Sequence, residues 1–499
     1  MKQHIDLGPV ELSYAAALRG VVPRTTGTPF RYIRCGAMDA QEMLGLAASN
    51  PEGEFVFILP DLTQANAAQA RARALRLPNL AFLGMSLSAL RAAIADGTQK
   101  LAQADYLCID CTSGGSATMY QDALALGQLL TIPGGLFVCR YAPFATPEEG
   151  LRFMVAEFGP ELPPEQHVEF LHELKQLGQT YFTTHPQQAL ALNQALGLQQ
   201  PEKFLQNFSH NSKPVSTTLN MIVGLTSNQF GFVGDAAVAA NYLEMMVPAA
   251  AQEMLYGLRE HLLYEIIKDF TSARAFRTDI WVKPAARLTT NLAQLFGSFY
   301  YGLTDIGAPL PERITVSGKD VDLKTPIVSG LLTLMRMMPV TIGDFLAHET
   351  GQEFKPTDVV MAVQILVACG VIAPMRGSFG GMGQADHAYP RLAGQYNQQL
   401  RGMAIDGNYA LLASPVAGRP LRLQLSEALV LQAVDRVGFA ESADSLLGEL
   451  LRISTNPEQA HLVFSAGKDP APDFAENLIH EICTANMLGW YALGILDAA

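Results

Sequence analysis

Charge is scarce in this sequence, and positive charge is the scarcer sign. Only 16% of its 499 residues are charged, and the formal net charge is −13 with a sequence pI near 5.3. The lysines and arginines form no dense cluster. Proteins that bind nucleic acid or an anionic membrane surface concentrate positive charge, so we expect neither as the main partner. An acidic surface is compatible with a protein partner.

Long hydrophobic runs are also missing. A transmembrane helix needs about 20 consecutive apolar residues, and the longest candidate here, residues 328–340, is interrupted by Arg336 and Pro339. The amino terminus, Met1 to Asp6, lacks the apolar core of a secretory signal. We therefore expect a cytoplasmic protein with no membrane insertion.

Cysteine is rare as well, with six residues that lie mostly inside apolar runs. This pattern is typical of reduced, buried thiols. Cys108 and Cys111 have the C-x-x-C spacing of a zinc or redox pair, but no second pair or histidine spacing completes a tetrahedral site. We interpret them as packing residues and expect no bound metal.

The chain has ample apolar material, because 49% of its residues are hydrophobic. Over the first 145 residues, strand-like and helix-like segments alternate. We expect strands at 32–35, 54–59, 80–83, 106–111 and 136–139, and helices at 41–48, 63–75 and 119–130. Such alternation predicts an α/β fold in which helices cover a parallel sheet.

The pattern changes after residue 146 to helices separated by proline-bearing loops. Residues 249–270 predict one long amphipathic helix. Residues 320–375 read as helix, short helix, helix and strand, an order that resembles a winged helix. A glycine-rich stretch, 377–383, then leads into the last segment of helices and short strands.

Several short motifs, in order, resemble the class I S-adenosylmethionine-dependent methyltransferases that carry a methyltransferase regulatory domain. Bacterial protein-lysine methyltransferases that act on outer-membrane proteins belong to this group. The motifs that carry the resemblance are Phe30–Gly36, Ala47–Pro51, Leu77–Asn79, Pro133–Gly135, Phe208–Asn211, Gly231–Asp235, Arg274–Val282 and Ala413–Gly418. His210 and Asn211 stand where the family has His-Glu, and we favour a structural role between domains for them.

The resemblance implies a division of the chain. Residues 1–148 would form a Rossmann-like class I methyltransferase domain. Residues 149–207 would form a helical segment similar to the family's dimerisation region, which makes a homodimer an expectation. A regulatory domain (208–318), a winged-helix-like segment (319–392) and a carboxy-terminal domain (393–499) would follow.

The family's cofactor motif, Glu-(Leu/Ile)-Gly-Cys-Gly-x-Gly, is altered here. The chain reads Arg34-Cys35-Gly36-Ala37-Met38-Asp39-Ala40. Arg34 replaces the carboxylate that would face the cationic end of S-adenosylmethionine, and a guanidinium keeps its charge. Met38 replaces a glycine beside the path of the ligand. Asp39 could contact a ligand hydroxyl, but capping the next helix is the simpler role.

Two further strands carry candidate site residues. Leu59 aligns with the acidic residue that grips the ribose hydroxyls, and Asp61 follows it after Pro60. Asp110 ends another strand, where open α/β sheets place ligands, although a bond that orders the loop is an equal alternative. The segments Ile109–Gly114 and Arg140–Ala145 lack most of the aromatic and polar groups that the family uses to orient an amine.

Three hypotheses follow. In the first, the protein is a pseudoenzyme that serves as a scaffold or regulatory subunit for an active methyltransferase homologue or its protein substrate. In the second, it is an active protein-lysine or other amine methyltransferase in which Asp39, Asp61 and Asp110 replace the lost cofactor contacts. In the third, Arg34 binds some other anionic small molecule, with a salt bridge as the simpler role for this arginine.

Overall fold

The computed structural model describes residues 7–25, 27–112, 117–158, 163–176, 180–197, 202–203, 217–258, 263–305, 312–316, 319–377, 390–399, 409–437, 448–449, 452 and 489–498. Within this part of the chain, none of the helices combines the length and hydrophobicity that crossing a lipid bilayer requires. The sequence motif Phe208–Asn211 lies outside the described residues, as does most of the stretch 377–383.

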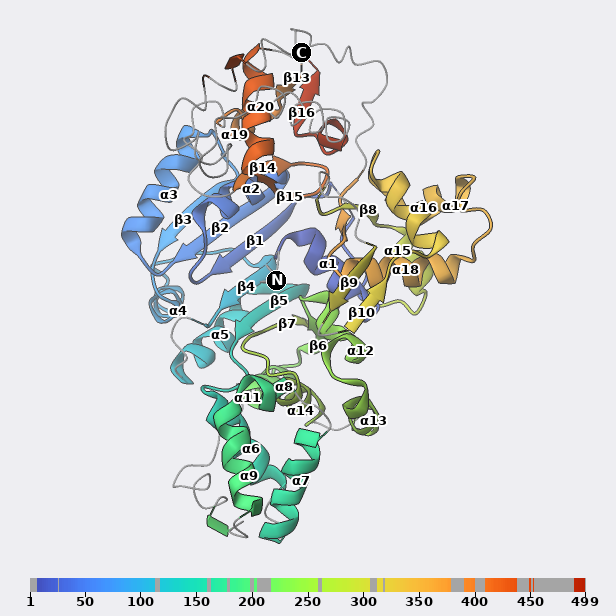
Figure 1. The fold of residues 1–499 in the computed structure, drawn as a ribbon. Helices are drawn as coiled ribbons and strands as arrows, with labels where there is room; N and C mark the ends of the chain where they lie inside the picture. Colours follow the sequence, from blue (N-terminus) through green and yellow to red (C-terminus); the bar gives the residue numbers. More distant parts are fainter. Residues whose placement is uncertain are drawn as a thin grey trace.

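A seven-stranded sheet forms the centre of the molecule (Figure 1). Its strand order is β3-β2-β1-β4-β5-β7-β6, with β1 to β5 parallel and the last two antiparallel to their neighbours. The strands are β1 (Phe30–Cys35), β2 (Gly53–Leu59), β3 (Leu80–Gly84), β4 (Ala104–Asp110), β5 (Thr131–Tyr141), β6 (Gly231–Asp235) and β7 (Arg277–Val282). The expected α/β fold is confirmed, and all five strands expected before residue 145 are present.

Alternate residues of each strand face two different cores. On β1, Tyr32 packs with the helices of one face, α1 (Pro9–Ala17), α2 (Ala40–Ser49) and α3 (Leu62–Ala74). Ile33 packs with those of the other face, α4 (Leu87–Ala95), α5 (Ala117–Leu130) and α11 (Thr217–Ser227). Burial on both faces explains why these strands read as nearly continuous apolar runs.

Strands β6 and β7 come from the part of the sequence that we assigned to the regulatory domain. They extend the sheet beyond β5, so the sheet spans the expected boundary at residue 148. The five-domain division itself stays a prediction.

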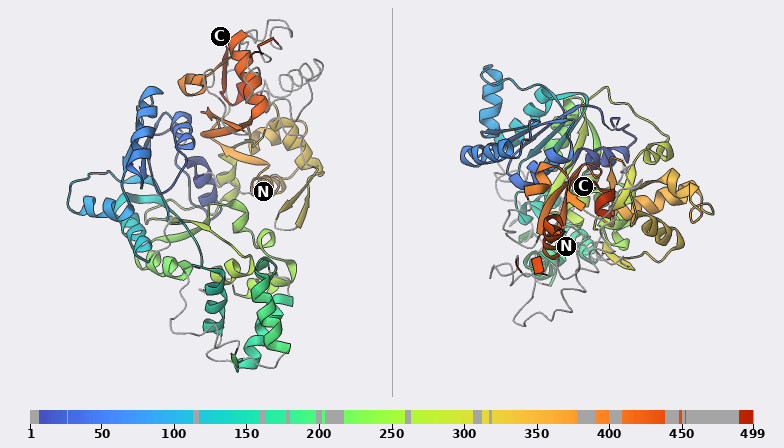
Figure 2. Two further views of the ribbon diagram at one scale, coloured as in Figure 1. Left: turned by 60° about the vertical axis from the view of Figure 1, so that its left-hand side comes forward. Right: turned by 90° about the horizontal axis from the view of Figure 1, so that it is seen from above.

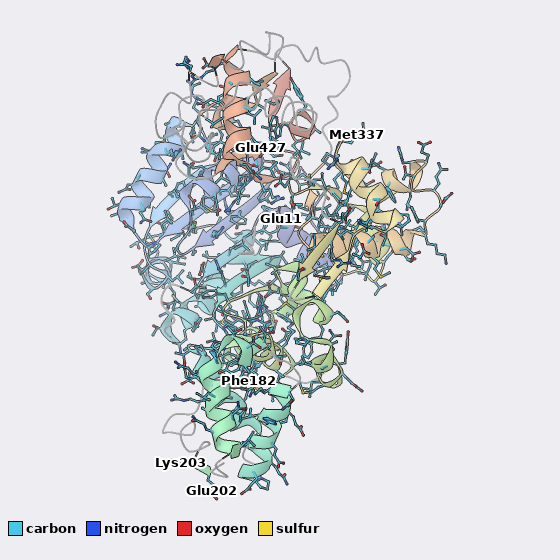
Figure 3. All side chains as sticks on the ribbon, in the orientation of Figure 1. Glu11, Phe182, Glu202, Lys203, Met337 and Glu427 are labelled. Atoms are coloured by element: carbon cyan, nitrogen blue, oxygen red, sulfur yellow. The ribbon has the colours of Figure 1, made fainter. Side chains whose placement is uncertain are left out.

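Helices project from one end of the sheet (Figures 1 and 2), and Glu202 and Lys203 lie at the far tip of this projection (Figure 3). They are α6 (Pro147–Phe158), α7 (Pro164–Gln176), α8 (Thr180–Thr184) and α9 (Pro186–Gly197). Their shared core includes α12 (Leu243–Met246), α13 (Ala249–Gly257) and α14 (Tyr264–Thr271). We expected a single helix over 249–270, and this prediction is wrong. The structure has two helices there, because α13 ends at Gly257, a poor helix former, and α14 begins at Tyr264.

A smaller sheet, β11-β8-β12, packs with α15 to α18 beside the main one. The order that we expected over 320–375 is present as a helix (326–335), a short helix (342–347), a helix (356–368) and a strand (372–375). Assignment to the winged-helix class stays a prediction. The strands of this sheet are β8 (Tyr300–Leu303), β11 (Val340–Thr341) and β12 (Ile372–Met375), and its helices are α15 (Leu292–Gly297), α16 (Pro326–Met335), α17 (Ile342–Ala347) and α18 (Pro356–Ala368). The 3-10 helix η1 (Val238–Asn241) and a separate pair of strands, β9 (Arg313–Val316) and β10 (Lys319–Asp322), are also present.

The carboxy-terminal elements pack over α2. Two of the family-like motifs meet here: Asn50 Nδ2 donates to the carbonyl of Gly418 (2.7 Å), and Ser414 N–H donates to Ser49 Oγ (3.1 Å). The elements are β13 (Pro390–Leu392), α19 (Gly394–Gln398), β14 (Tyr409–Ser414), β15 (Arg419–Gln424), α20 (Leu425–Val437) and β16 (Leu496–Ala498).

A buried ionic network, which we call the Arg277 network, holds β7 against α14 and β6. The Arg277 guanidinium contacts Asp269 (2.8 Å), Asp279 (2.8 Å) and Glu265 (2.9 Å) with its side chain only 1% exposed. Arg274 pairs with Asp235 on β6 at 2.8 Å. The motif Arg274–Val282 is therefore structural: it supplies the cations for carboxylates from three elements.

Within this network the pKa of one carboxyl group is raised and that of another is lowered. Burial raises the pKa of Asp279 to about 6 against the opposing charge of Arg277. Burial also acts on Glu265, but the charges of Lys268 and Arg277 outweigh it and lower the pKa of this carboxyl to about 2. Glu265 is therefore ionised across the physiological range and stabilised by its partners.

Replacing Arg277 with methionine should lower the free energy of unfolding by roughly 3–5 kcal/mol, because buried carboxylates lose their main cation. Urea denaturation followed by circular dichroism measures this. The control is Arg313→Met, since the Arg313 side chain is 65% exposed and its pair with Asp320 spans 3.5 Å; it should cost no more than about 1 kcal/mol. Equal losses in the two variants would contradict a special role for the network.

The Glu265→Gln variant should show a pH-dependent defect. The folded pKa of Glu265 lies below its ordinary value, so its stabilisation is present above about pH 4.5 and is lost as the pH falls toward 2. The difference in unfolding free energy between the wild type and the variant should be about 3 kcal/mol at pH 7 and shrink steadily below pH 4.5. Urea titrations from pH 7 to 3 test this, and a difference that grows in acid would refute it.

Candidate functional site

The carboxyl ends of β1, β2 and β4 form the edge where a cofactor would bind. The chain runs outward from β1 to β3 and then crosses back to β4, so the strand order reverses between β1 and β4. Open α/β sheets bind ligands at such a switch point. Six of the seven candidate residues lie at or just beyond these strand ends, and Arg34 lies one residue before the end of β1.

Gly36 follows β1 and is required by the backbone itself. Its φ is +121°, and its N–H donates to the carbonyl of Ile58 at 3.0 Å. A Cβ at this position would lie 2.8 Å from the Cβ of Asp110 and 2.9 Å from its carbonyl oxygen. The ends of β1 and β4 thus approach each other too closely for any side chain, with or without a ligand.

Asp39 and Asp61 each cap a helix. Asp39 Oδ1 accepts from Gln41 N–H (2.8 Å) at the start of α2. Asp61 Oδ1 accepts from Thr63 N–H (2.7 Å) and Gln64 N–H (3.2 Å) at the start of α3. Both side chains are exposed. Capping is thus observed for Asp39, as the sequence favoured, and it was missed for Asp61.

Asp110 orders the loop that follows β4. Its Oδ1 accepts from the N–H (2.8 Å) and the hydroxyl (2.5 Å) of Thr112, and its Oδ2 lies 3.6 Å from Arg140 Nη1. The side chain is only 10% exposed. The loop-ordering role that we considered is therefore present, and contact with a ligand stays a prediction.

Leu59 and Met38 belong to the hydrophobic core rather than to a polar site. Leu59 is 2% exposed in the core beneath α1, α2 and α3, and the half-buried Met38 packs against the same core. The last residue of β2 is thus apolar, and the first carboxylate after it, Asp61, lies two residues further on.

Arg34 is set apart from the other candidates. Its half-buried side chain points to the α2 side of the sheet, where Nη1 lies 3.9 Å from Met43 Sδ. It forms no ion pair within the described part of the chain, so the salt bridge considered from the sequence is not found there. It lines a cavity of about 150 Å³ together with Glu42, Arg419 and Arg422. None of the other six candidates lines that cavity.

Cys108, Cys111 and Cys139 behave as packing residues. Cys108 and Cys111 belong to the cores on opposite faces of the sheet, and Cys111 Sγ lies 3.9 Å from Cys139 Sγ. Burial raises the pKa of the Cys108 thiol to about 11. In the described ranges, no three histidine, cysteine or acidic residues are grouped to hold a metal ion.

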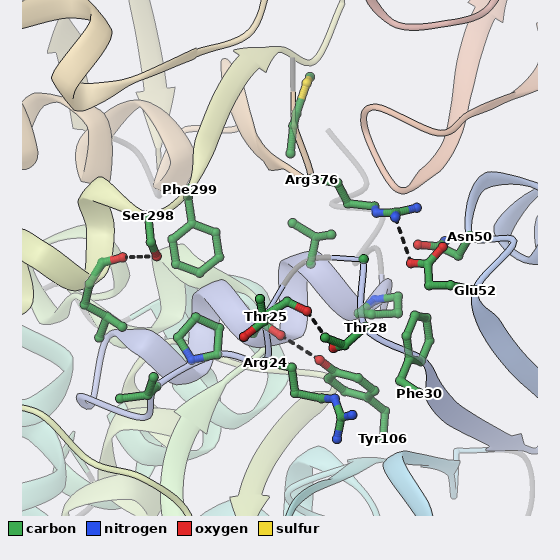
Figure 4. A pocket seen from close by; sticks show the side chains of 18 of the residues that line it. Arg24, Thr25, Thr28, Phe30, Asn50, Glu52, Tyr106, Ser298, Phe299 and Arg376 are labelled. Atoms are coloured by element: carbon green, nitrogen blue, oxygen red, sulfur yellow. Dashed lines mark hydrogen bonds and ion pairs between the residues drawn. The ribbon is translucent and has the colours of Figure 1, made fainter. Parts of the chain in front are cut away.

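A larger cavity, of about 500 Å³, lies at the opposite edge of the sheet and was missed from the sequence (Figure 4). Phe30, Tyr106 and Phe299 give it aromatic walls. Both of its arginines are already paired: Arg24 with Asp105, and Arg376 with Glu52 at 2.8 Å. Its lining is scattered between residues 9 and 376, so no motif indicates it.

Gly36→Ala should destabilise the fold by roughly 2–4 kcal/mol even without a cofactor, from strain at positive φ and the contact with Asp110. Gly97→Ala is the matched control, because φ is +76° there and nothing lies within 4 Å of the added Cβ; it should cost only about 1 kcal/mol. Thermal and urea unfolding of both variants measure the difference. Equal costs would mean that the close approach of β1 and β4 is not rigid.

Comparison with known proteins agrees with this architecture. The family model "Predicted methyltransferase regulatory domain" matches residues 210–283. PKMT2 from Rickettsia typhi superposes with a TM-score of 0.59 at 13% identity over 98% of both chains. The same protein in complex with AdoHcy gives 0.60 at 14% identity, also over 98% of both chains. No curated protein matches the sequence.

The resemblance stated from the sequence is thereby confirmed. The chain has the fold of the class I S-adenosylmethionine-dependent methyltransferases, and it contains a segment that matches their regulatory domain.

Proposed function

We propose that this protein does not transfer methyl groups itself and serves as a scaffold or regulatory subunit for an active methyltransferase or its protein substrate. The observation that carries the proposal is the charge at the end of β1. Arg34 stands where the family has a glutamate, and a guanidinium stays positive at all physiological pH values. A positive charge at this strand end disfavours a sulfonium cofactor, which is itself cationic.

The remaining carboxylates support the proposal because each already has protein donors. Asp39 and Asp61 accept from helix N-termini, and Asp110 accepts from Thr112. Giving up a helix cap costs about 1 kcal/mol, so a ligand that recruited these groups would bind more weakly. Each charge-assisted bond to the ribose that is missing costs a further ~1.5–3 kcal/mol.

The partner that we propose is a protein, in the cytoplasm. The net charge of −13 disfavours nucleic acid and anionic membranes. The projecting helices α6 to α9 offer a surface set apart from the sheet for a partner or for a second copy of this chain (Figure 2).

The second candidate function is an active protein-lysine methyltransferase with an atypical cofactor site. It is favoured by the extent of the similarity to PKMT2, which was also solved with AdoHcy, over 98% of both chains. The strand–turn–helix frame around Gly36 is retained as well.

Isothermal titration separates the two functions. The wild type should give no binding heat with millimolar S-adenosylmethionine. The variant Arg34→Glu/Ala37→Cys/Met38→Gly/Ala40→Gly restores the family motif and should gain measurable affinity, because its turn can again approach the ligand closely.

The control for this charge reversal is Arg24→Glu, at the opposite edge of the sheet, and circular dichroism should show that each variant is folded. A micromolar site in the wild type, with methyl transfer to a protein acceptor, would overturn the scaffold proposal in favour of the enzyme.

A further inference from the structure

The cavity beside Arg34 is partly open to solvent and is lined by parts of the chain that lie far apart in the sequence. Strand β1 gives Arg34, α2 gives Glu42 and Met43, and β15 gives Arg419 and Arg422. The hairpin of β14 and β15 packs against α2 and so forms the carboxy-terminal wall of the cavity. Its volume is about 150 Å³.

The charges around this cavity do not balance. Three arginines and one glutamate line it, which leaves a charge of 3 − 1 = +2. Glu42 Oε1 pairs with Arg422 Nη2 at 2.6 Å, and Glu11, just behind the lining, pairs with Arg419 Nε at 3.1 Å. Counting Glu11 leaves +1, and the positive group without a carboxylate among the described residues is Arg34. The larger cavity differs, since each of its arginines has an acidic partner.

The surroundings of Arg34 make that charge costly. Its Nη1 has the Met43 thioether at 3.9 Å, and its neighbours across the strand pairs are Phe57 on β2 and Cys108 on β4. A half-buried cation without an acidic partner is less stable than one paired with a carboxylate, and arginine cannot relieve this cost by losing its proton. An anion that entered the cavity would replace the missing partner.

We propose that this cavity binds a small oxyanion, a phosphate or a carboxylate group, through the guanidinium of Arg34. A guanidinium fork matches both groups with two parallel hydrogen bonds. A water molecule occupies about 30 Å³ in the liquid, so the cavity has room for roughly five waters or one such group. The cavity is smaller than the ~300 Å³ at which pockets for drug-sized ligands usually begin, so a small group suits it better.

Binding there would link the sheet to the carboxy-terminal hairpin. The anion would lie between the guanidinium of Arg34 on β1 and those of Arg419 and Arg422 on β15, which follow the motif contacts at Ser414 and Gly418 in the sequence. The proposed site goes beyond the scaffold role, because binding of a small anion could regulate the protein. It does not depend on that role.

Titration calorimetry with inorganic phosphate and, separately, with succinate tests the site in Tris buffer at low ionic strength. The two arms distinguish a phosphate from a carboxylate ligand. Binding of either should raise the melting temperature. Arg34→Gln should weaken that binding at least about tenfold, whereas Arg34→Lys keeps the charge and should retain part of it.

Arg24→Gln is the matched control, because it removes one positive charge far from the cavity and should leave the affinity unchanged. No binding of either anion to the wild type would overturn the proposal, as would equal affinities in the wild type and a folded Arg34→Gln variant. If S-adenosylmethionine displaces the bound anion, anion recognition by Arg34 is supported and the scaffold proposal fails instead. The two proposals can therefore fail separately.

Discussion

The extended sheet depends on one guanidinium, that of Arg277. Around it, three cations (Lys268, Arg274, Arg277) meet four carboxylates (Asp235, Glu265, Asp269, Asp279), so the network carries one negative charge in excess. The excess is consistent with burial raising the pKa of Asp279 to about 6. Tyr141 on β5 donates to the same carboxylate, which ties β5 to β7 by a side-chain bond in addition to the strand pairing.

The edge formed by the carboxyl ends of β1, β2 and β4 keeps its shape without a ligand. At the cofactor edge, the turn geometry is maintained by contacts among protein atoms, as Gly36 and Asp110 show. The polar groups there are used for capping and loop order. Contacts among protein atoms therefore maintain the fold of this edge, and the fold alone does not establish what the edge binds.

Local features of the fold could be predicted from the sequence, and assembled features could not. The strands of the first 145 residues follow from apolar runs, and the cap at Asp39 follows from residue type. The joining of β6 and β7 to β5 depends on pairing across more than a hundred residues, which no local pattern records. Arg34 was identified by its position in a motif, but its separation from Asp39, Asp61 and Asp110 required knowing which way its side chain turns.

The order of strands has a consequence for synthesis on the ribosome. Strand β5 is complete at residue 141, but its partner β7 is not made until residue 282. If β1 to β5 pair before β7 is made, the outer edge of β5 has free backbone donors and acceptors, with Phe137 and Val138 among the side chains of that strand. An uncovered edge of this kind recruits strands from other chains. A fragment released by premature termination in this interval would keep that edge uncovered and would therefore be prone to aggregate.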